Sequence, residues 1–360
     1  MTADGPSTYD AIVVVSFGGP EGPDDVMPFL RNVTRGRDVP DGRLGLVAEQ
    51  YMTTGGRSPI NDLNRALVGA LHDELATHGH DLPVYWGNRN WDPYLSDVVA
   101  TMRDDGVGRA LAFVTSAYSS YSACRQYLDD IDAARATVGR GAPQIDKIRQ
   151  FWNHPGFIEP LRDGAARAMS ALTTGDGALD PTRVHLLGTA HSLPTAMAAT
   201  CDYEVQLRDA LDLVAEVAPG LASDLVWQSR SGPPQVPWLE PDVNDHLRAL
   251  AGQGVEGVVV VPVGFVSDHQ EVVYDLDVMA RATADELGMR LVRVPTPGTD
   301  PRFVSMVREL FEERQLGAMP RALGAMGVRP APCELGCCPA PARVGEAGRS
   351  PRPTRAAQED

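Results

Sequence analysis

The sequence is short of positive charge. Its 360 residues carry 32 lysines and arginines against 48 aspartates and glutamates, which gives a formal net charge of −16. Nucleic acids and anionic lipid surfaces both select for clustered lysine and arginine, so this balance argues against either as a main partner. We therefore expect no nucleic-acid partner and no strong electrostatic association with a membrane.

Long hydrophobic runs and an export signal are also missing. No apolar run approaches the roughly 20 residues that span a bilayer, and the first residues, MTADGPSTYDAIVVV, place no basic segment before an apolar one. Cysteine is scarce, and an odd number without an export signal makes a disulfide framework improbable. We expect a soluble, cytoplasmic protein whose thiols stay reduced or bind metal. The five cysteines are Cys124, Cys201, Cys333, Cys337 and Cys338.

Short apolar runs alternate with segments of helical period, a pattern typical of parallel sheets covered by helices on both faces. Strands are predicted at residues 11–17, 83–88, 110–116, 183–190, 224–229, 257–265 and 290–294. Helices are predicted near residues 60–78, 96–105, 125–138, 156–172, 203–217, 242–252, 270–286 and 301–315. The fold class is therefore α/β.

Three of these strands precede residues 140–155 and four follow, which favours two doubly wound halves. We place the halves at residues 8–150 and 151–318, joined near the sequence FWNHPGF, with a proline- and glycine-rich tail at 319–360. In open parallel sheets, ligands bind beyond the carboxyl ends of the strands, and a cleft between the two halves is expected.

One histidine stands where this rule places a functional group. The stretch GTAHSLP, residues 188–194, carries His191 to the end of a predicted strand and stops at Pro194. The alternative interpretation is a histidine that only satisfies a hydrogen bond at the strand end.

A second stretch, GFVSDHQEVVYDLD at residues 264–277, follows a predicted strand and opens a helix. Asp268 and Glu271 have the spacing of a capping box, which is the structural explanation for those two residues. Glu271 and Asp275 would share one helical face, where like charges repel unless a cation, a proton or solvent intervenes. Imidazole and carboxylates without cysteine suit ferrous iron, or a similar cation, better than a structural zinc. Asp268, His269 and Asp275 are secondary candidates for an iron or proton route.

These stretches, in order with VWQSRSGPPQVPWLEPD (226–242), resemble the signature segments of ferrochelatases, which insert ferrous iron into a porphyrin in haem synthesis. The resemblance extends to residues 13–30, 55–60 and 85–99, and so spans most of residues 10–315. It implies two Rossmann-like domains around a porphyrin cleft. It also implies that His191 and Glu271 face each other across the macrocycle as catalytic and iron-binding residues.

The chemistry of metalation fits such a pair, because a dication replaces two pyrrole N–H protons. The site must accept protons and also present iron to the ring. A neutral imidazole or a carboxylate can do either task at cytoplasmic pH, so the two roles are assigned to His191 and Glu271 jointly.

The resemblance also suggests contacts to the porphyrin. It points to Ser58, in GGRSPI, and to Tyr127, in CRQYLDD, as porphyrin-binding residues. Nearby arginines suit propionates, because guanidinium binds carboxylate in bidentate fashion; the candidates are Arg31, Arg35 and Arg37. Trp227 and Trp238 are expected to pack as walls or core. In many ferrochelatases of Gram-positive bacteria a tyrosine in the first loop binds iron; this chain has Phe17, which cannot ligate a metal.

Some ferrochelatases bind a 2Fe–2S cluster through three C-terminal cysteines and one from the N-terminal half. By this resemblance the cluster ligands are Cys124, Cys333, Cys337 and Cys338, with Cys124 preferred over Cys201. Because Cys337 and Cys338 are adjacent, a zinc site or unused thiols stay open as alternatives.

The expected function is insertion of Fe(2+) into coproporphyrin III, with protoporphyrin IX as the close rival. A cobalt chelatase and a non-catalytic tetrapyrrole or iron carrier are the further alternatives. The expected partners are the porphyrin and ferrous iron, with transient contacts to neighbouring enzymes of haem synthesis.

Overall fold

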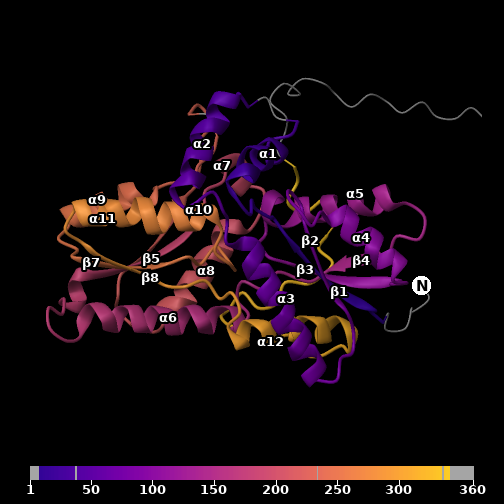
Figure 1. Ribbon diagram of the computed structural model, residues 1–360. Helices are drawn as coiled ribbons and strands as arrows, with labels where there is room; N and C mark the ends of the chain where they lie inside the picture. The colour runs from indigo at the N-terminus through magenta and orange to yellow at the C-terminus, as the bar shows by residue number, and fades with distance from the viewer. Residues whose placement is uncertain (1–7, 37–38, 233, 335, 341–360) are drawn as a thin grey trace, which may run out of the picture.

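The computed structural model describes residues 8–36, 39–232, 234–334 and 336–340, and in it eight parallel strands form two four-stranded sheets (Figure 1). The first sheet has the order β2-β1-β3-β4, and the second has the order β6-β5-β7-β8. The strands are β1 (Ala11–Ser16), β2 (Val84–Asn88), β3 (Arg109–Val114), β4 (Gln144–Lys147), β5 (Val184–His191), β6 (Ser223–Gln228), β7 (Gly257–Val261) and β8 (Arg290–Arg293). All seven predicted strands are present. The prediction of only three strands in the first half was wrong, because the edge strand β4 has a single aliphatic residue, Ile145, and gives no apolar run.

Helices connect the strands, and every predicted helix is present. Three more, α1, α2 and α7, were not predicted: α1 contains Pro28, α2 contains two glycines, and α7 spans only four residues. The α-helices are α1 (Pro23–Val33), α2 (Asp41–Thr53), α3 (Ile60–Thr77), α4 (Leu95–Asp104), α5 (Gln126–Val138), α6 (Pro155–Thr173), α7 (Thr195–Ala198), α8 (Tyr203–Ala215), α9 (Val243–Gly252), α10 (Gln270–Val272), α11 (Arg281–Glu286) and α12 (Pro301–Gln315). The π-helices η1 (Tyr121–Arg125) and η3 (Val273–Ala280) precede α5 and α11, and η2 (Pro181–Arg183) is a 3-10 turn. Among the described residues, no helix is both long and apolar enough to cross a bilayer.

Each sheet is covered on both faces, as near-continuous apolar strands require. One face of the first sheet packs against α4 and α5, and one face of the second packs against α9 and α11. The remaining faces share a single hydrophobic cluster, which runs from Ile12 and Phe113 of the first sheet to Leu186 and Val259 of the second. The two sheets are therefore joined by one continuous core.

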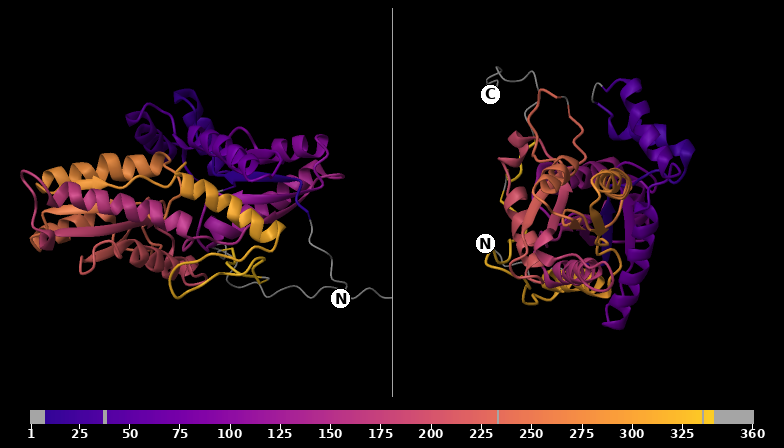
Figure 2. Two further views of the ribbon diagram at one scale, coloured as in Figure 1. Left: turned by 90° about the horizontal axis from the view of Figure 1, so that it is seen from below. Right: turned by 90° about the vertical axis from the view of Figure 1, so that its left-hand side faces the viewer.

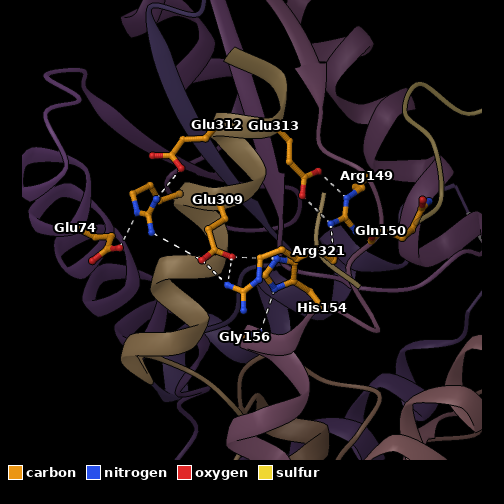
Figure 3. Close-up of polar contacts among 10 residues, drawn as sticks. Glu74, Arg149, Gln150, His154, Gly156, Glu309, Glu312, Glu313 and Arg321 are labelled. Atoms are coloured by element: carbon orange, nitrogen blue, oxygen red, sulfur yellow. Dashed lines mark hydrogen bonds and ion pairs between the residues drawn. The ribbon is translucent and has the colours of Figure 1, made fainter. Parts of the chain in front are cut away.

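Helix α12 ties the second half of the chain back to the first. It packs against both α3 and α6, and Figure 2 shows it lying beside α6. Figure 3 shows polar contacts along this helix, among them the bidentate pair of Arg149 and Glu313. Arg308 of α12 joins Glu74 of α3 to Glu312. The Arg149–Glu313 distances are 2.7 and 2.8 Å, and both side chains are buried.

The residues after α12 have no regular secondary structure as far as they are described, in agreement with the predicted extended tail. They are nevertheless held against the body. Asn153 donates to the carbonyl oxygens of Leu323 and Gly327, and Arg149 donates to that of Arg321 at 2.9 Å. This path brings the cysteines of the tail towards the first half of the chain.

Candidate active site

His191 is the last residue of β5, at the carboxyl end of the second sheet, where the sequence placed it. The loop that follows is fixed by hydrogen bonds to residues 237–239. Ser192 donates its hydroxyl to the carbonyl oxygen of Leu239 at 2.8 Å, and the amide of Leu239 donates to Leu193. Tyr203 donates to the carbonyl oxygen of His191 at 3.1 Å. The small residues and Pro194 therefore hold the imidazole at the strand end.

One hydrogen bond sets the tautomer of the His191 ring. Its Nδ1 lies 2.6 Å from the carbonyl oxygen of Ser192. A carbonyl oxygen only accepts, so Nδ1 carries the hydrogen, and in the neutral ring Nε2 holds the free lone pair. That lone pair is available for a proton or a metal ion, and the side chain is 30% exposed.

Glu271 lies in the short helix α10, and its carboxylate Oε2 is 3.5 Å from His191 Nε2. The helix does not begin with the predicted capping box. His269 is the N-cap instead, and its Nδ1 accepts the amide hydrogen of Glu271 at 3.2 Å. Asp268 turns away to pair with Arg293, with both oxygens at 3.1 Å. The capping box, the alternative explanation for Asp268 and Glu271, is therefore not formed, and Asp268 instead joins a long-range ion pair.

The resemblance implied that His191 and Glu271 face each other across a macrocycle. Both residues come instead from the second half of the chain, and at 3.5 Å they leave no space for a ring between them. The structure thus brings the two groups together, and both would face the same side of a macrocycle bound beside them.

Asp275 lies near this pair, close enough for the charge of Glu271 to act on its carboxyl group. The hydroxyl of Ser229 donates to Asp275, and Gln228 Nε2 approaches both Asp275 Oδ2 and the carbonyl oxygen of Glu271 at 3.3 Å. Burial raises the pKa of Asp275 to about 6 despite the Ser229 hydrogen bond, and the negative charge of Glu271 acts in the same direction. Asp275 can therefore exchange a proton near neutral pH.

The raised pKa predicts how stability depends on pH. Because the folded-state pKa of Asp275, about 6, exceeds the ordinary aspartate value of 3.8, the folded chain binds more protons between these values, and stability falls as the pH rises through that window. The loss above pH 6 amounts to about 3 kcal/mol. We expect Asp275→Asn to increase the free energy of unfolding at pH 7.5 and to leave it nearly unchanged at pH 4. Urea unfolding at both pH values measures the difference; an equal effect at the two values would contradict the assignment.

Two further groups beside the pair were not predicted. Ser229 has a φ of 61°, a left-handed conformation that is uncommon for a residue with a side chain and often occurs at functional sites. Tyr51, at the end of α2, is buried, and burial together with the charge of Glu271 raises its pKa. Nothing local in the sequence signals either position, because each depends on elements that meet only in the folded chain.

Helix α2 of the first half reaches the site directly. Gln270, next to Glu271, donates to the carbonyl oxygen of Gln50 at 3.1 Å, and Thr54 donates to Gln270 at 2.7 Å. Figure 1 shows α2 beside the start of α10. A pocket of about 550 Å³ adjoins the residue after His191 and is lined by Ser192, Trp227, Gln228, Arg230, Leu239, Glu240, Pro241, Asp242 and Asp245. The site thus lies where the first half, β5 and α10 converge.

The suggested porphyrin contacts, Ser58 and Tyr127, both belong to the first half of the chain. Ser58 is buried under the first loop, where its amide donates to the carbonyl oxygen of Pro20 at 2.9 Å. Tyr127 is buried in the core, and its ring stacks on the guanidinium group of Arg89. The guanidinium carbon lies 4.4 Å from the centroid of the Tyr127 ring and 5.7 Å from the centroid of the Phe17 ring. Within the described part of the chain, no hydrogen bond or ion pair joins Ser58 or Tyr127 to His191 or Glu271.

The arginines suggested for the propionates lie on the surface where they are described, whereas the two tryptophans pack against the protein. Arg31 pairs with Asp41 at 3.1 Å on the surface, and Arg35 is exposed, whereas Arg37 lies outside the described residues. Trp227 is buried in the core, as expected, and Trp238 is partly buried against the loop at Gly232.

The predicted cluster ligands lie near one another. Gln150 donates to the sulfur of Cys124 at 3.0 Å and lies 3.8 Å from that of Cys333. Burial, followed by the neighbouring thiols of Cys333 and Cys124, raises the pKa of Cys337, and similar effects raise that of Cys338 to about 12. Within the described part of the chain, no three of these sulfur atoms lie within 4.8 Å of one another. The thiols gather without forming a preformed single-metal site.

Comparisons with known proteins agree with the geometry. Residues 9–315 match the family model described as Ferrochelatase. A coproporphyrin III ferrochelatase of Frankia alni is 53% identical over 355 residues, covering 95% of this chain and 89% of the relative. One from Nocardia farcinica is 51% identical, covering 94% and 99%. A ferrochelatase of Rhodopirellula baltica is 50% identical, covering 92% and 93%.

Solved structures resemble the chain in fold. SirB from Bacillus subtilis with Fe3+ aligns with a TM-score of 0.52 at 10% identity, covering 85% of this chain and 97% of SirB. The cobalt complex of the sirohydrochlorin chelatase SirB from Bacillus subtilis subspecies spizizenii has a TM-score of 0.50 at 9% identity, covering 86% and 97%. These likenesses confirm the predicted α/β fold with two Rossmann-like sheets.

Proposed function

Because this chain belongs to the ferrochelatase family, we propose that it inserts ferrous iron into coproporphyrin III to give Fe-coproporphyrin III in haem biosynthesis. The observation that carries the proposal is the contact of His191 Nε2 with Glu271 at 3.5 Å, at the carboxyl end of a parallel sheet. An unprotonated imidazole nitrogen beside a carboxylate is suited to accept protons and to hold a divalent cation.

In the proposed mechanism the pair acts from one face of the porphyrin. The lone pair on His191 Nε2 accepts a pyrrole proton, and Glu271 stabilises the imidazolium that results. Asp275, with its pKa raised to about 6, lies behind Glu271 and passes protons onward. Removal of two protons leaves the ring with the two negative charges that ferrous iron balances, and the carboxylate of Glu271 is a suitable ligand for the arriving cation.

The choice of coproporphyrin rests on charge. Coproporphyrin carries four propionates and protoporphyrin two, so the first needs more cationic or amide partners. Two exposed arginines lie at or near the pocket: Arg230 lines it, and Arg43 of α2 donates to the carbonyl oxygen of Ser231, next to Arg230, at 3.2 Å. Guanidinium groups of this kind bind carboxylates in bidentate fashion. The names of the actinobacterial relatives support the same substrate.

Anaerobic assays of iron insertion into the two porphyrins, run side by side, test this function. We expect a higher kcat/KM for coproporphyrin III than for protoporphyrin IX. The charge argument also predicts that Arg230→Gln raises KM for coproporphyrin more than for protoporphyrin. A preference for protoporphyrin would contradict the substrate assignment, and no metalation of either porphyrin would contradict the enzyme.

We also propose that Cys124, Cys333, Cys337 and Cys338 hold a 2Fe–2S cluster. The donor set fits: the four cysteines come from two parts of the chain, and burial together with the charges of neighbouring thiols raises the pKa of Cys337 and of Cys338. A bound cation relieves that repulsion. In a two-iron cluster, each iron needs two nearby thiolate ligands, so the four sulfur atoms need not surround a single metal ion. Cys201 instead directs its thiol to the carbonyl oxygens of Met197 and Ala198, both at 3.5 Å. The cluster would fasten the tail to the body; iron insertion itself transfers no electrons.

The cluster has a spectroscopic test. We expect protein purified anaerobically to absorb in the visible and to contain about two irons and two sulfides per chain. Cys124→Ser should lose this absorption because it removes the ligand that belongs to the body, whereas the matched Cys201→Ser should keep it. Colourless wild-type protein prepared without oxygen, or equal colour in the two variants, would contradict the ligand set.

Two further proposals concern the cellular location of the protein and its domain boundaries. We propose a cytoplasmic location, because all five cysteines are free thiols, which fits a reducing compartment. We further propose residues 8–150 and 151–318 as the two Rossmann-like domains, since each range contains one complete four-stranded sheet.

A further inference from the structure

A second group of metal-ligating side chains lies near the opposite end of the second sheet. His185 of β5 and His246 of α9 both direct Nε2 at the same oxygen of Asp224 in β6, with distances of 2.8 and 2.9 Å. All three ligand atoms lie within 4.8 Å of one another. In the part of the chain that the structure describes, this is the only group of three or more histidine, cysteine or acidic residues with that property.

This group is separate from the candidate active site. His185 and His191 stand six residues apart on the same strand, which corresponds to about 20 Å. His185 and Asp224 lie near the amino ends of their strands, and His246 reaches them from the helix that covers this face of the sheet. No step of iron insertion uses these residues.

The arrangement has the composition and the geometry of a metal site. Two imidazole nitrogens and one carboxylate oxygen form a ligand set that zinc and other borderline divalent cations prefer. Tetrahedral zinc with bonds of about 2.0–2.1 Å places its ligand atoms about 3.3 Å apart, so each His–Asp distance needs to lengthen by only about half an ångström. The Asp224 side chain is 46% exposed, so solvent can reach a fourth position.

The surroundings favour the ligand forms of these residues. His185 is largely buried, and burial lowers the pKa of its imidazole, which keeps the ring neutral at pH 7. Burial alone would raise the pKa of Asp224, but the hydrogen bonds with His246 and His185 hold that pKa below its ordinary value. In the alternative arrangement, both rings donate an Nε2 hydrogen to this carboxylate and no metal is present.

We propose that His185, Asp224 and His246 bind one Zn2+ ion, with water as the fourth ligand. The ion would link β5, β6 and α9, and so fix the helix whose Asp245, with the preceding residues 239–242, lines the pocket. Three protein ligands and one water form an open coordination site, but its distance from the reacting groups separates it from iron insertion.

Zinc binding by the full-length protein tests the proposal. After removal of metals with a chelator, Zn2+ is titrated in competition with a chromophoric indicator. We expect His185→Gln and His246→Gln each to lower the affinity for one equivalent of zinc by about ten-fold or more, since even the loss of a group that only hydrogen-bonds to a ligand lowers metal affinity by that much. The control His72→Gln, at a surface histidine whose side chain is 64% exposed, should change nothing.

A crystallographic measurement distinguishes zinc bound at this site from zinc bound elsewhere on the protein. In crystals of the wild-type chain soaked with Zn2+, the anomalous difference map at the zinc edge should show a peak about 2.0–2.1 Å from Nε2 of both histidines. His191→Ala should leave this peak in place. A map without the peak, or zinc affinities that are equal in the wild type and both glutamine variants, would overturn the proposal without affecting the proposed iron insertion.

Discussion

Replacing His191 with alanine should lower the rate of iron insertion by about 10²- to 10⁴-fold, the range that a positioned acid–base group contributes. The ring supplies the Nε2 lone pair nearest Glu271, and its Nδ1 is already occupied by the Ser192 carbonyl. No other imidazole replaces it there, because His269 directs its Nδ1 to the amide of Glu271. Anaerobic single-turnover assays with coproporphyrin III measure the loss.

Two controls separate chemistry from positioning. The variant should retain its fold by circular dichroism and should still bind porphyrin, because the loss concerns proton transfer. Added imidazole should restore part of the rate if the missing group is a base. Glu271→Gln tests the second member of the pair and should also slow insertion. A His191→Ala enzyme with nearly wild-type turnover would refute the assignment.

The second large effect concerns the ion pair under α12. We expect Glu313→Ala to lower the free energy of unfolding by about 3–5 kcal/mol, because it leaves the guanidinium of Arg149 buried and unpaired. That guanidinium also donates to the carbonyl oxygens of Gln150 and Arg321 (Figure 3). Urea denaturation measures the change.

A surface pair provides the matched control. Glu204 and Arg208 form an exposed pair at 2.8 Å within α8, so Glu204→Ala should change stability by less than about 1 kcal/mol. Since Arg149 contacts both the tail and Gln150, which donates to Cys124, we also expect Glu313→Ala to reduce the content of the proposed cluster. Equal destabilisation by the two alanine variants would show that burial does not decide the effect.

The fold was largely predictable because its main signals are local. Runs such as residues 257–261, all buried, are too apolar for any position other than the centre of a covered parallel sheet. The exceptions lacked such signals: β4 is an edge strand with one buried aliphatic residue, and α1 carries a proline inside the helix. In both cases tertiary contacts, which the sequence does not display, select the structure.

In the candidate site, too, the features with local sequence signals were predictable and those that depend on tertiary contacts were not. His191 and Glu271 were identifiable because strand-end position and motif order both point to them. Their mutual arrangement was not, because which face of a ligand they occupy depends on how α10 meets β5. Ser229 and Tyr51 show the same limit: each lies beside a carboxylate from a different element, and only the folded chain brings them together.

A structure of this chain with coproporphyrin III bound would decide whether His191 and Glu271 act together on one face of the porphyrin. We expect the centre of the macrocycle next to His191 Nε2, with Glu271 on the same face and Asp275 behind it. A porphyrin bound away from His191, or with His191 and Glu271 on opposite faces, would refute the proposed mechanism.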